Sequence, residues 1–292
     1  MATAEGTLRR LLPSVDVLWE VADARCPVAS RNRRLVHLVG GKPRLLVLAR
    51  PDRADPGVTA DWVRGLAADQ PTLAMDLRQP RPSDIAALWA QSRQAIARAG
   101  GSVPPLGRLK AMVAGVPNTG KSTLLNRASG GRHLAVADRP GVTRGEQWLH
   151  SAEEGMLLDL PGVLPTRLGP WPVAWRLWAV GVVAVDAVDP EMGASELLGW
   201  IAERSPMGLT TRYALEPGEP QAMLAVIAAR CGLLRAGGRP DTGAAAQRVR
   251  SDFGKGLLGR ISLEVPGGEP RGEIGGPAGT GATGAQGAAP AL

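Results

Sequence analysis

One segment of the sequence carries the glycine, lysine and hydroxyl residues that can hold a chain of phosphates. The run Gly115-Val-Pro-Asn-Thr-Gly-Lys-Ser122 matches the pattern G-x-x-x-x-G-K-S/T. In such a loop, successive backbone N–H groups converge on phosphate oxygens at the positive end of a helix dipole. Lys121 is then suited to bridge the β- and γ-phosphates, and Ser122 to place its hydroxyl on Mg²⁺. The motif predicts a nucleotide site formed by Pro117, Asn118, Thr119, Gly120, Lys121, Ser122 and Thr123.

Two further segments supply residues that accompany such a loop in nucleotide hydrolases. Asp159-Leu-Pro-Gly162 lies downstream, where P-loop proteins place an Asp that holds Mg²⁺ through water and a Gly that senses the γ-phosphate. Between the two motifs, Thr143 is a candidate to complete the Mg²⁺ shell; an ordinary loop threonine is the alternative. We therefore expect Mg²⁺ to be held by Ser122, Thr143 and, through water, Asp159, with Gly162 against the nucleotide.

These motifs need strands and helices to position them. Apolar runs at residues 15–23, 44–49, 72–77, 109–115 and 156–160 predict strands. Helices are expected at residues 32–39, from Ser83 as N-cap through Ile96, and from Ser122 through Leu125. Strands that alternate with helices favour a mostly parallel sheet with helices on both faces. The phosphate-binding loop then follows the fourth predicted strand.

The remainder of the chain predicts a second, smaller unit. After residue 190 the apolar residues recur with helical spacing, whereas residues 266–292 are rich in Gly, Ala and Pro and cannot form a packed core. The length of 292 residues suits about two domains. We place a nucleotide-binding domain at residues 1–188, an all-α domain at residues 189–265 and a disordered tail at residues 266–292.

Composition excludes several classes of protein. Hydrophobic residues make up 44% and charged residues 21%, as in ordinary globular proteins and unlike fibrous or wholly disordered chains. Cys26 and Cys231 lack the spacing of a zinc site or a redox pair, so we interpret them as reduced packing residues. The N-terminus has no apolar stretch of a secretory signal, and no apolar run approaches the length of a membrane span. We expect a cytoplasmic protein.

Together these three motifs resemble those of GTPases of the translation-factor-like class. The resemblance implies a base-reading motif, N-K-x-D, and nothing after Asp159 fits it. The candidate precedes the phosphate-binding loop: Ala49-Arg-Pro-Asp52, at the end of a predicted strand. Asp52 can accept hydrogen bonds from guanine N1–H and the 2-amino group. This order, with the base motif first, marks a circular permutation, which preserves the packing of a sheet when the cut lies in an exposed loop.

Together these residues resemble the YlqF/RbgA family of circularly permuted ribosome-biogenesis GTPases, over about residues 8–265. The segments that carry the resemblance are residues 15–16, 23–27, 30–32, 115–122, 139–143, 158–162, 250–256 and 258–264. The resemblance implies an α/β fold, a circularly permuted P-loop GTPase domain, followed by a small all-α C-terminal domain. It further implies a GTP-binding and GTP-hydrolysing assembly factor for the large ribosomal subunit precursor, whose helical domain grips rRNA. We expect it to act as a monomer.

Charge agrees with a polyanionic partner, because 34 Lys and Arg residues against 27 Asp and Glu residues give a net charge of +7. Candidate phosphate contacts in the C-terminal part are Arg230, Arg235, Arg239, Arg248, Arg250, Lys255 and Arg260. A solvated basic face without a ligand is the alternative. In related GTPases an Asn at the place of Asn118 goes with potassium-stimulated hydrolysis, so Asn118 is a candidate K⁺ ligand; an amide that only stabilises the loop is the other interpretation.

The sequence departs from the family pattern at three places. Ala49 replaces the Asn that ties the base loop to the P-loop, although the Arg50 stem could still cover the base face. The family's P-G-H-M-x-K-A stretch, whose His is implicated in hydrolysis, has no counterpart, and the residue after Gly162 is Val163. Met75-Asp76 stands in the place of the loop that cradles guanine O6. The catalytic residue that activates water is therefore unknown, and hydrolysis is expected to be slow.

Two alternatives follow from these departures. The first is a nucleotide-gated rRNA-binding protein with negligible hydrolysis. The second is a P-loop ATPase, against which the retained Asp52 argues, because a carboxylate there distinguishes guanine from adenine.

Overall fold

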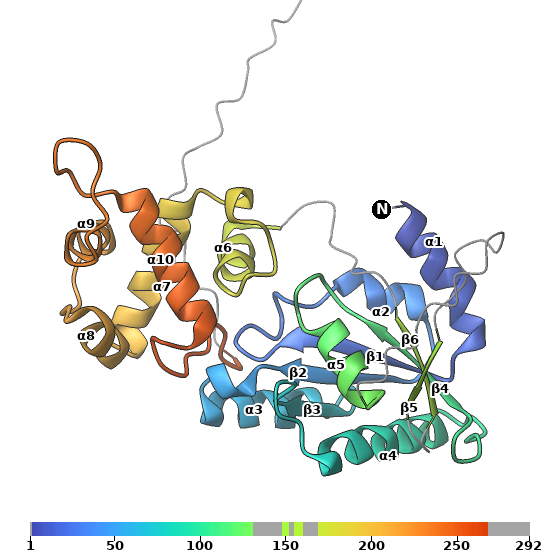
Figure 1. Cartoon of the computed structure of the whole chain (residues 1–292). Coiled ribbons are helices and arrows are strands. Elements are labelled where there is room, and N and C mark those ends of the chain that lie inside the picture. The colour runs from blue at the N-terminus through green and yellow to red at the C-terminus, as the bar shows by residue number, and fades with distance from the viewer. Residues whose placement is uncertain (1, 131–147, 152–154, 160–168, 268–292) are drawn as a thin grey trace, which may run out of the picture.

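The computed structural model describes residues 2–130, 148–151, 155–159 and 169–267. An α/β part is followed by a group of helices that packs beside one end of the sheet (Figure 1). The predicted site residues Thr143 and Gly162 lie outside the described residues, as does the tail from residue 268 onward. In the described part of the chain, every helix is too short or too polar to cross a membrane.

The described strands form one six-stranded sheet in the order β3-β2-β1-β4-β6-β5. Their bounds are Val17–Asp23 for β1, Arg44–Ala49 for β2, Thr72–Met75 for β3, Leu109–Ala114 for β4, Trp148–Ser151 for β5 and Gly155–Asp159 for β6. All pairs are parallel except β5 with β6, so the predicted mostly parallel sheet is confirmed and β5 is an additional edge strand. The chain runs outward from β1 to β3 and then returns to the other side of β1 as β4. Ligands of open α/β sheets bind at such a reversal.

Helices cover both faces of the sheet (Figure 1). Their bounds are Ala2–Leu11 for α1, Arg33–Val39 for α2, Pro56–Leu66 for α3, Pro82–Arg98 for α4 and Lys121–Ala128 for α5. α4 and α5 pack on one face around the buried Trp19, whose indole N–H donates to Ser92 Oγ at 2.9 Å and whose ring lies 4.7 Å from that of Trp89. α1 and α2 cover the other face near β4, and α3 covers it near β2.

The start of α4 differs from the prediction. Its N-cap is Arg81, and not Ser83, because Pro82 occupies the first turn and the Asp84 carboxylate accepts a hydrogen bond from the Arg81 N–H at 2.9 Å. Proline suits this position, since its missing N–H would have no partner in the first turn of a helix.

The C-terminal helices share one hydrophobic cluster. They are α6, Trp171–Ala179; α7, Pro190–Arg204; α8, Met207–Tyr213; α9, Pro220–Arg230; and α10, Thr242–Lys255. α6, which the sequence analysis placed with the nucleotide-binding domain, packs in this cluster against α7 and α10. The same cluster includes Cys26, Ala29 and Val116 from the α/β part, so the two parts pack through a common apolar interface.

Candidate nucleotide-binding site

The P-loop occupies the predicted place between a strand and a helix. β4 ends at Ala114 and α5 begins at Lys121. Gly115 has φ 147°, and a Cβ on it would lie 2.5 Å from the Val21 carbonyl oxygen. Gly120 also has positive φ, 114°, at the N-cap of α5. Glycine is therefore required at both ends of the loop by backbone conformation, and at Gly115 also by the close approach of β1.

Inside the loop, two side chains converge on one carbonyl. The Lys121 ammonium and the Thr119 hydroxyl each donate to the Val116 carbonyl oxygen at 2.9 Å. Burial lowers the pKa of Lys121, and the negative charge of Asp159 opposes this effect. Burial likewise raises the pKa of Asp159, and Lys121 opposes it. The two side chains therefore sense each other's charge, as expected for a P-loop lysine and the acidic residue of the neighbouring strand.

The oxygen donors that the structure describes fit Mg²⁺. Ser122 is exposed in the first turn of α5, and Asp159 is exposed at the end of β6, where Val113 of β4 is its register partner. Mg²⁺ prefers oxygen ligands and binds nucleotide sites through one or two carboxylates plus substrate phosphates. In the described ranges no group of three or more His, Cys, Asp or Glu residues could hold a metal by itself. The Ser122 hydroxyl and the Asp159 carboxylate are oxygen donors of the kind that Mg²⁺ uses at sites where nucleotide phosphates supply further ligands.

The base-reading candidate lies close to the P-loop. Asp52 sits in a 3₁₀ turn, Pro51–Arg53, directly after β2, with its side chain 32% exposed and one carboxylate oxygen 3.5 Å from Arg53 Nε. A Cβ added to Gly120 would lie 3.7 Å from the Ala49 Cβ and 3.0 Å from Leu77 Cδ1. The end of β2 and the loop after β3 therefore border the P-loop, which brings the predicted base and phosphate contacts to one edge of the sheet.

Arg50 takes a different place from the one expected. Its side chain was expected to cover the base face, but its Nη2 donates to the Asn118 carbonyl oxygen at 2.6 Å and its Nη1 donates to the Asp23 carboxylate at 2.8 Å. The loop that carries Asp52 is thus tied to the P-loop by Arg50. The Asn118 amide donates to the Val182 carbonyl oxygen at 3.4 Å, which is a loop-stabilising contact.

A buried ion pair at the end of β1 supports this arrangement. Asp23 and Arg25 are both fully buried and lie 2.8 Å apart. Burial alone would raise the pKa of Asp23, but the charge and hydrogen bonds of Arg25, with the charge of Arg50, hold it below its ordinary value. Arg25 also donates to the Val180 carbonyl oxygen at 3.3 Å and lies 5.0 Å from the Phe253 ring centroid. The sequence analysis used these residues only as family signatures and missed this role; an Asp and an Arg two positions apart at the end of a largely apolar strand were the available signal.

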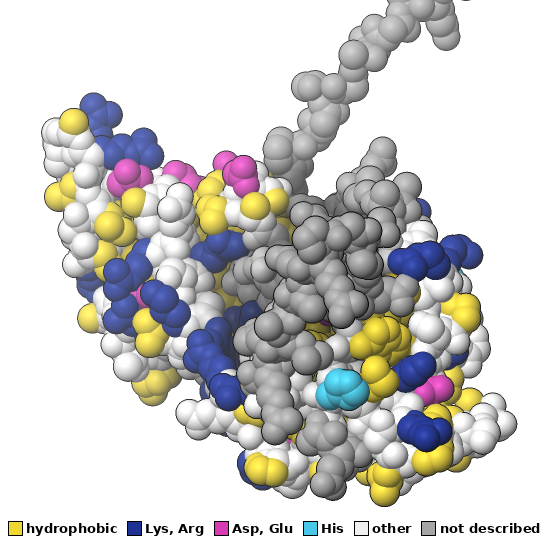
Figure 2. Space-filling view, turned by 45° about the vertical axis from the view of Figure 1, so that its right-hand side comes forward, with side chains coloured by type: hydrophobic (Ala, Val, Ile, Leu, Met, Phe, Trp, Pro, Cys, Tyr) yellow, Lys and Arg dark blue, Asp and Glu magenta, His cyan; other side chains and the backbone are white. Residues whose placement is uncertain are grey.

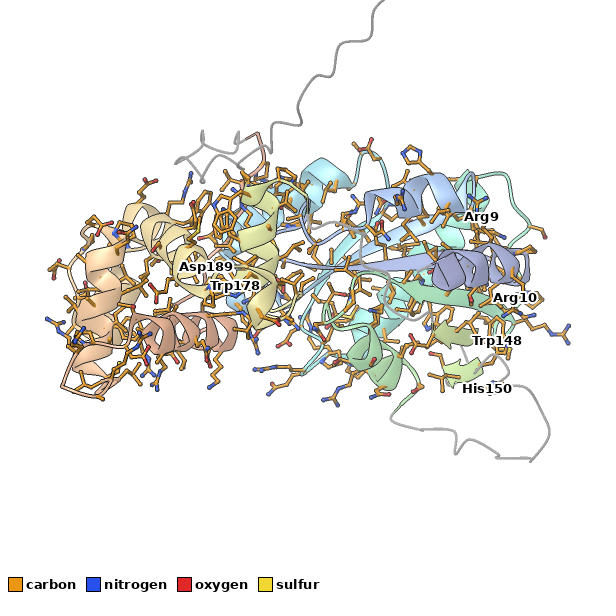
Figure 3. All side chains as sticks on the ribbon, turned by 90° about the horizontal axis from the view of Figure 1, so that it is seen from above. Arg9, Arg10, Trp148, His150, Trp178 and Asp189 are labelled. Carbon is orange, nitrogen blue, oxygen red and sulfur yellow. The ribbon has the colours of Figure 1, made fainter. Side chains whose placement is uncertain are left out.

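The described histidines lie away from this site. His37 is exposed in the last turn of α2. His150 is exposed on the edge strand β5 opposite Met156, at the far end of the molecule from Trp178 of the helical part (Figure 3).

The P-loop lies at the reversal point of a parallel sheet, with a carboxylate-bearing loop beside it, and this arrangement defines a P-loop nucleotide-binding domain. A family model described as "50S ribosome-binding GTPase" matches residues 110–191. The chain is 32% identical to ribosome biogenesis GTPase A of Bacillus licheniformis, over 91% of this chain and 96% of that protein. It is 29% identical to the protein of the same name from Thermotoga maritima, over 90% and 91% of the two chains. The chain belongs to the ribosome biogenesis GTPase A (YlqF/RbgA) family and is a GTP-binding and GTP-hydrolysing protein.

Solved structures support the fold. The structure of GNP-bound YlqF from T. maritima matches with a TM-score of 0.65 and 24% identity, covering 91% of this chain and 99% of that one. A GDP-bound YlqF structure matches with a TM-score of 0.63 and 24% identity, over 89% and 99% of the two chains. The circularly permuted GTPase fold with helices at the C-terminal end is therefore as predicted.

Proposed function

We propose that this GTPase assists the assembly of the large ribosomal subunit, with the nucleotide bound between the P-loop and the turn that carries Asp52. The convergence of those two loops at the reversal point of the sheet carries the proposed nucleotide site. The family model and the relatives named ribosome biogenesis GTPase A support the ribosomal role. The N–H groups of residues 116–122 and the Lys121 ammonium contact the phosphates, and Asp52 accepts from guanine N1–H and the 2-amino group. Thr143 keeps its expected role as a ligand of Mg²⁺, and Gly162 keeps its expected role as the sensor of the γ-phosphate.

Mg²⁺ fits this site through Ser122 and, by way of water, Asp159, with Thr143 as the further ligand that the sequence predicts. When bound, it supplies positive charge to the phosphate oxygens. Asn118 is the proposed K⁺ ligand, and its carbonyl group already accepts from Arg50. The side-chain amide nitrogen of Asn118 donates to the Val182 carbonyl oxygen, so the side-chain amide oxygen is the atom that K⁺ would contact.

The helical part is the proposed rRNA-binding domain, with α6 included on the basis of its packing. Lys and Arg side chains gather in several places on its surface (Figure 2). Much of the predicted basic set has internal partners: Arg235 pairs with Asp241, Arg248 with Asp252, and Arg250 donates to two main-chain carbonyls. Among the described residues, Arg239 and Lys255 are exposed without such partners, which makes them the strongest candidates for phosphate contacts.

Single-turnover GTP hydrolysis, with and without purified large ribosomal subunits, tests this function. A monomer acting in the cytoplasm is expected to hydrolyse GTP alone at about 10⁻⁴ to 10⁻² per second, the range of unassisted GTPases. The subunits should accelerate the release of phosphate, and a Lys121→Ala variant should release none under either condition. Hydrolysis that ribosomal subunits leave unchanged would contradict the proposed partner, whereas binding to the subunits without any hydrolysis would favour the nucleotide-gated alternative.

A further inference from the structure

The turn that carries Asp52 is held by the segment that follows the last helix. We call residues 256–264 the C-terminal strap. Arg260 of the strap donates through Nε to the Ala54 carbonyl oxygen at 3.0 Å and through Nη2 to the Pro51 carbonyl oxygen at 2.9 Å. The Ile261 N–H donates to the Arg53 carbonyl oxygen at 3.0 Å. These three bonds fix the main chain on both sides of Asp52.

Two more contacts extend this support. The Asp55 N–H donates to Ser262 Oγ at 3.2 Å. Arg53, the neighbour of Asp52, donates through Nη1 to the Gly254 carbonyl oxygen at the end of α10. Each residue from position 51 to 55 other than Asp52 therefore has a hydrogen bond to the strap or to α10. The carboxylate of Asp52 lies in the middle of a turn whose flanks are both held from the helical part.

The strap itself is firmly anchored, so it can position the turn. Ile261 and Leu263 are buried. The Leu263 N–H donates to the Arg25 carbonyl oxygen at 2.6 Å, and the Glu264 carboxylate accepts from the N–H groups of Val28 and Ala29 at 2.6 and 2.9 Å. On the helical side, the Trp200 indole N–H donates to the Ser262 carbonyl oxygen at 2.9 Å. The strap is thus bonded both to the sheet and to the helices.

We propose that the C-terminal strap is part of the guanine-recognition site and that Arg260 is a positioning residue for the Asp52 carboxylate. The proposal rests on the assignment of Asp52 as the base-reading residue. Two hydrogen bonds from guanine to one carboxylate require a fixed turn. The planar Arg260 guanidinium presents its donors to two carbonyls in a fixed geometry, whereas a Lys ammonium is a point charge on a flexible stem. Coupling free energies act equally in both directions, so if the docked strap favours guanine binding, bound guanine favours the docked strap. Guanine binding therefore also stabilises the placement of the helical part.

The test uses the full-length protein with Mg²⁺ and compares dissociation constants for GDP and IDP, measured by competition with fluorescent GDP. IDP keeps the N1–H group and both phosphates but lacks the 2-amino group. Arg260→Lys should reduce the preference for GDP over IDP by about threefold to tenfold, because GDP loses two weakened bonds and IDP only one. The matched control is Arg98→Lys, an exposed arginine in the last turn of α4, which should leave the preference unchanged.

Two further variants keep the outcomes separate. Ser262→Ala removes the hydroxyl that accepts from the Asp55 N–H. It should lower the preference for GDP over IDP by a smaller factor than Arg260→Lys does, and it tests the strap even if Arg260→Lys does not fold. An unchanged preference in both folded strap variants, or an equal loss of GDP and IDP affinity, would overturn the role of the strap. Asp52→Asn tests the underlying assignment: if it keeps the wild-type preference, Asp52 does not read the base, and the proposed nucleotide site is wrong independently of the strap.

Discussion

The Arg50 guanidinium donates to the Asn118 carbonyl oxygen at 2.6 Å and so joins the end of β2, next to the turn that carries Asp52, to the P-loop. Arg50 has a left-handed backbone conformation, with φ 61°, which costs a residue with a side chain about 1–2 kcal/mol. Its ion pair with the fully buried Asp23 at 2.8 Å helps to offset this strain. The side chain of Arg50 thus connects the loop after β2 both to the P-loop and to the end of β1.

Replacement of Arg50 should weaken nucleotide binding. Arg50→Ala removes the contacts with Asn118 and Asp23, and we expect GDP affinity to fall about tenfold, the equivalent of one or two hydrogen bonds. Arg50→Gly should lose the same affinity with a smaller loss of stability, because glycine relieves the backbone strain. Isothermal titration and thermal unfolding measure the two effects. The control is Arg64→Ala, an exposed arginine of α3; equal affinity of all four proteins for GDP would contradict the role of Arg50.

Acid should weaken the interfaces that depend on two buried carboxylates. Burial would raise the pKa of Asp252, but hydrogen bonds from Arg212, Arg248 and Tyr213 hold it below its ordinary value, as Arg25 and Arg50 do for Asp23. A lowered folded-state pKa contributes stability that is present above the unfolded value of about 3.9 and is lost as pH falls through the folded value. The free energy of unfolding should therefore decrease between pH 5 and pH 2 (approximate limits).

Asp252→Asn isolates this effect. In urea unfolding at neutral pH the variant should be less stable than the wild type by about 2–4 kcal/mol, since Arg212 and Arg248 lose their charged partner. The difference should shrink as the pH falls below about 4, where the wild-type carboxylate also becomes neutral. A difference that stays constant down to acidic pH would show that the ionised form of Asp252 is not what stabilises the fold.

The two cysteines should differ in reactivity. Burial raises the pKa of the Cys26 thiol well above its ordinary value, aided by the charges of Asp23 and Glu264, whereas Cys231 is only partly buried. The thiolate is the reactive form, so a disulfide reagent at neutral pH should modify Cys231 quickly and Cys26 only after unfolding. In a Cys231→Ser variant, rapid modification of the native protein would mean that the shared apolar interface around Cys26 opens readily.

RNA binding should depend on a small part of the basic surface. Arg239→Ala and Lys255→Ala should each weaken binding to rRNA and reduce the salt slope of the affinity by about one, while stability changes by less than about 0.5 kcal/mol. Arg250 donates to the carbonyl oxygens of Trp178 and Val183, so Arg250→Ala should instead lower the melting temperature. Filter binding over a salt series separates the exposed Arg239 and Lys255 from the internally bonded Arg250. An unchanged salt slope in both the Arg239→Ala and the Lys255→Ala variant would exclude these two residues as phosphate contacts.

Local patterns in the sequence predicted the parts of the fold that local forces determine. The P-loop strand, its helix and the permuted order were correct because apolar runs and the spacing of Gly115, Gly120 and Lys121 depend on neighbours in the chain. α1, α3 and β5 were missed: α1 and α3 contain helix-weakening glycines, and β5 is a short edge strand of four residues. The apolar residues of α1 and α3 do recur at helical spacing, on the faces that pack against the sheet, so their periodicity was an available signal that the sequence analysis did not use.

Contacts between distant residues could not be predicted in this way. The bond from Arg50 to Asn118 spans 68 positions, and that from Arg260 to Ala54 spans 206. Nothing in a sequence distinguishes an arginine that will donate to a main-chain carbonyl from one that will face a phosphate. The sequence analysis named Arg248, Arg250 and Arg260 as candidate phosphate contacts, and the structure gives each of them a hydrogen bond within the protein.

Equilibrium binding of GDP and ADP to the purified protein, with Mg²⁺ and in either potassium or sodium buffer, tests the central claim most directly. The arrangement of Asp52 beside the P-loop predicts that GDP binds and that ADP fails to compete with it, and that Asp52→Ala abolishes this selectivity. Equal binding of GDP and ADP by the wild-type protein would contradict a guanine site at this edge of the sheet.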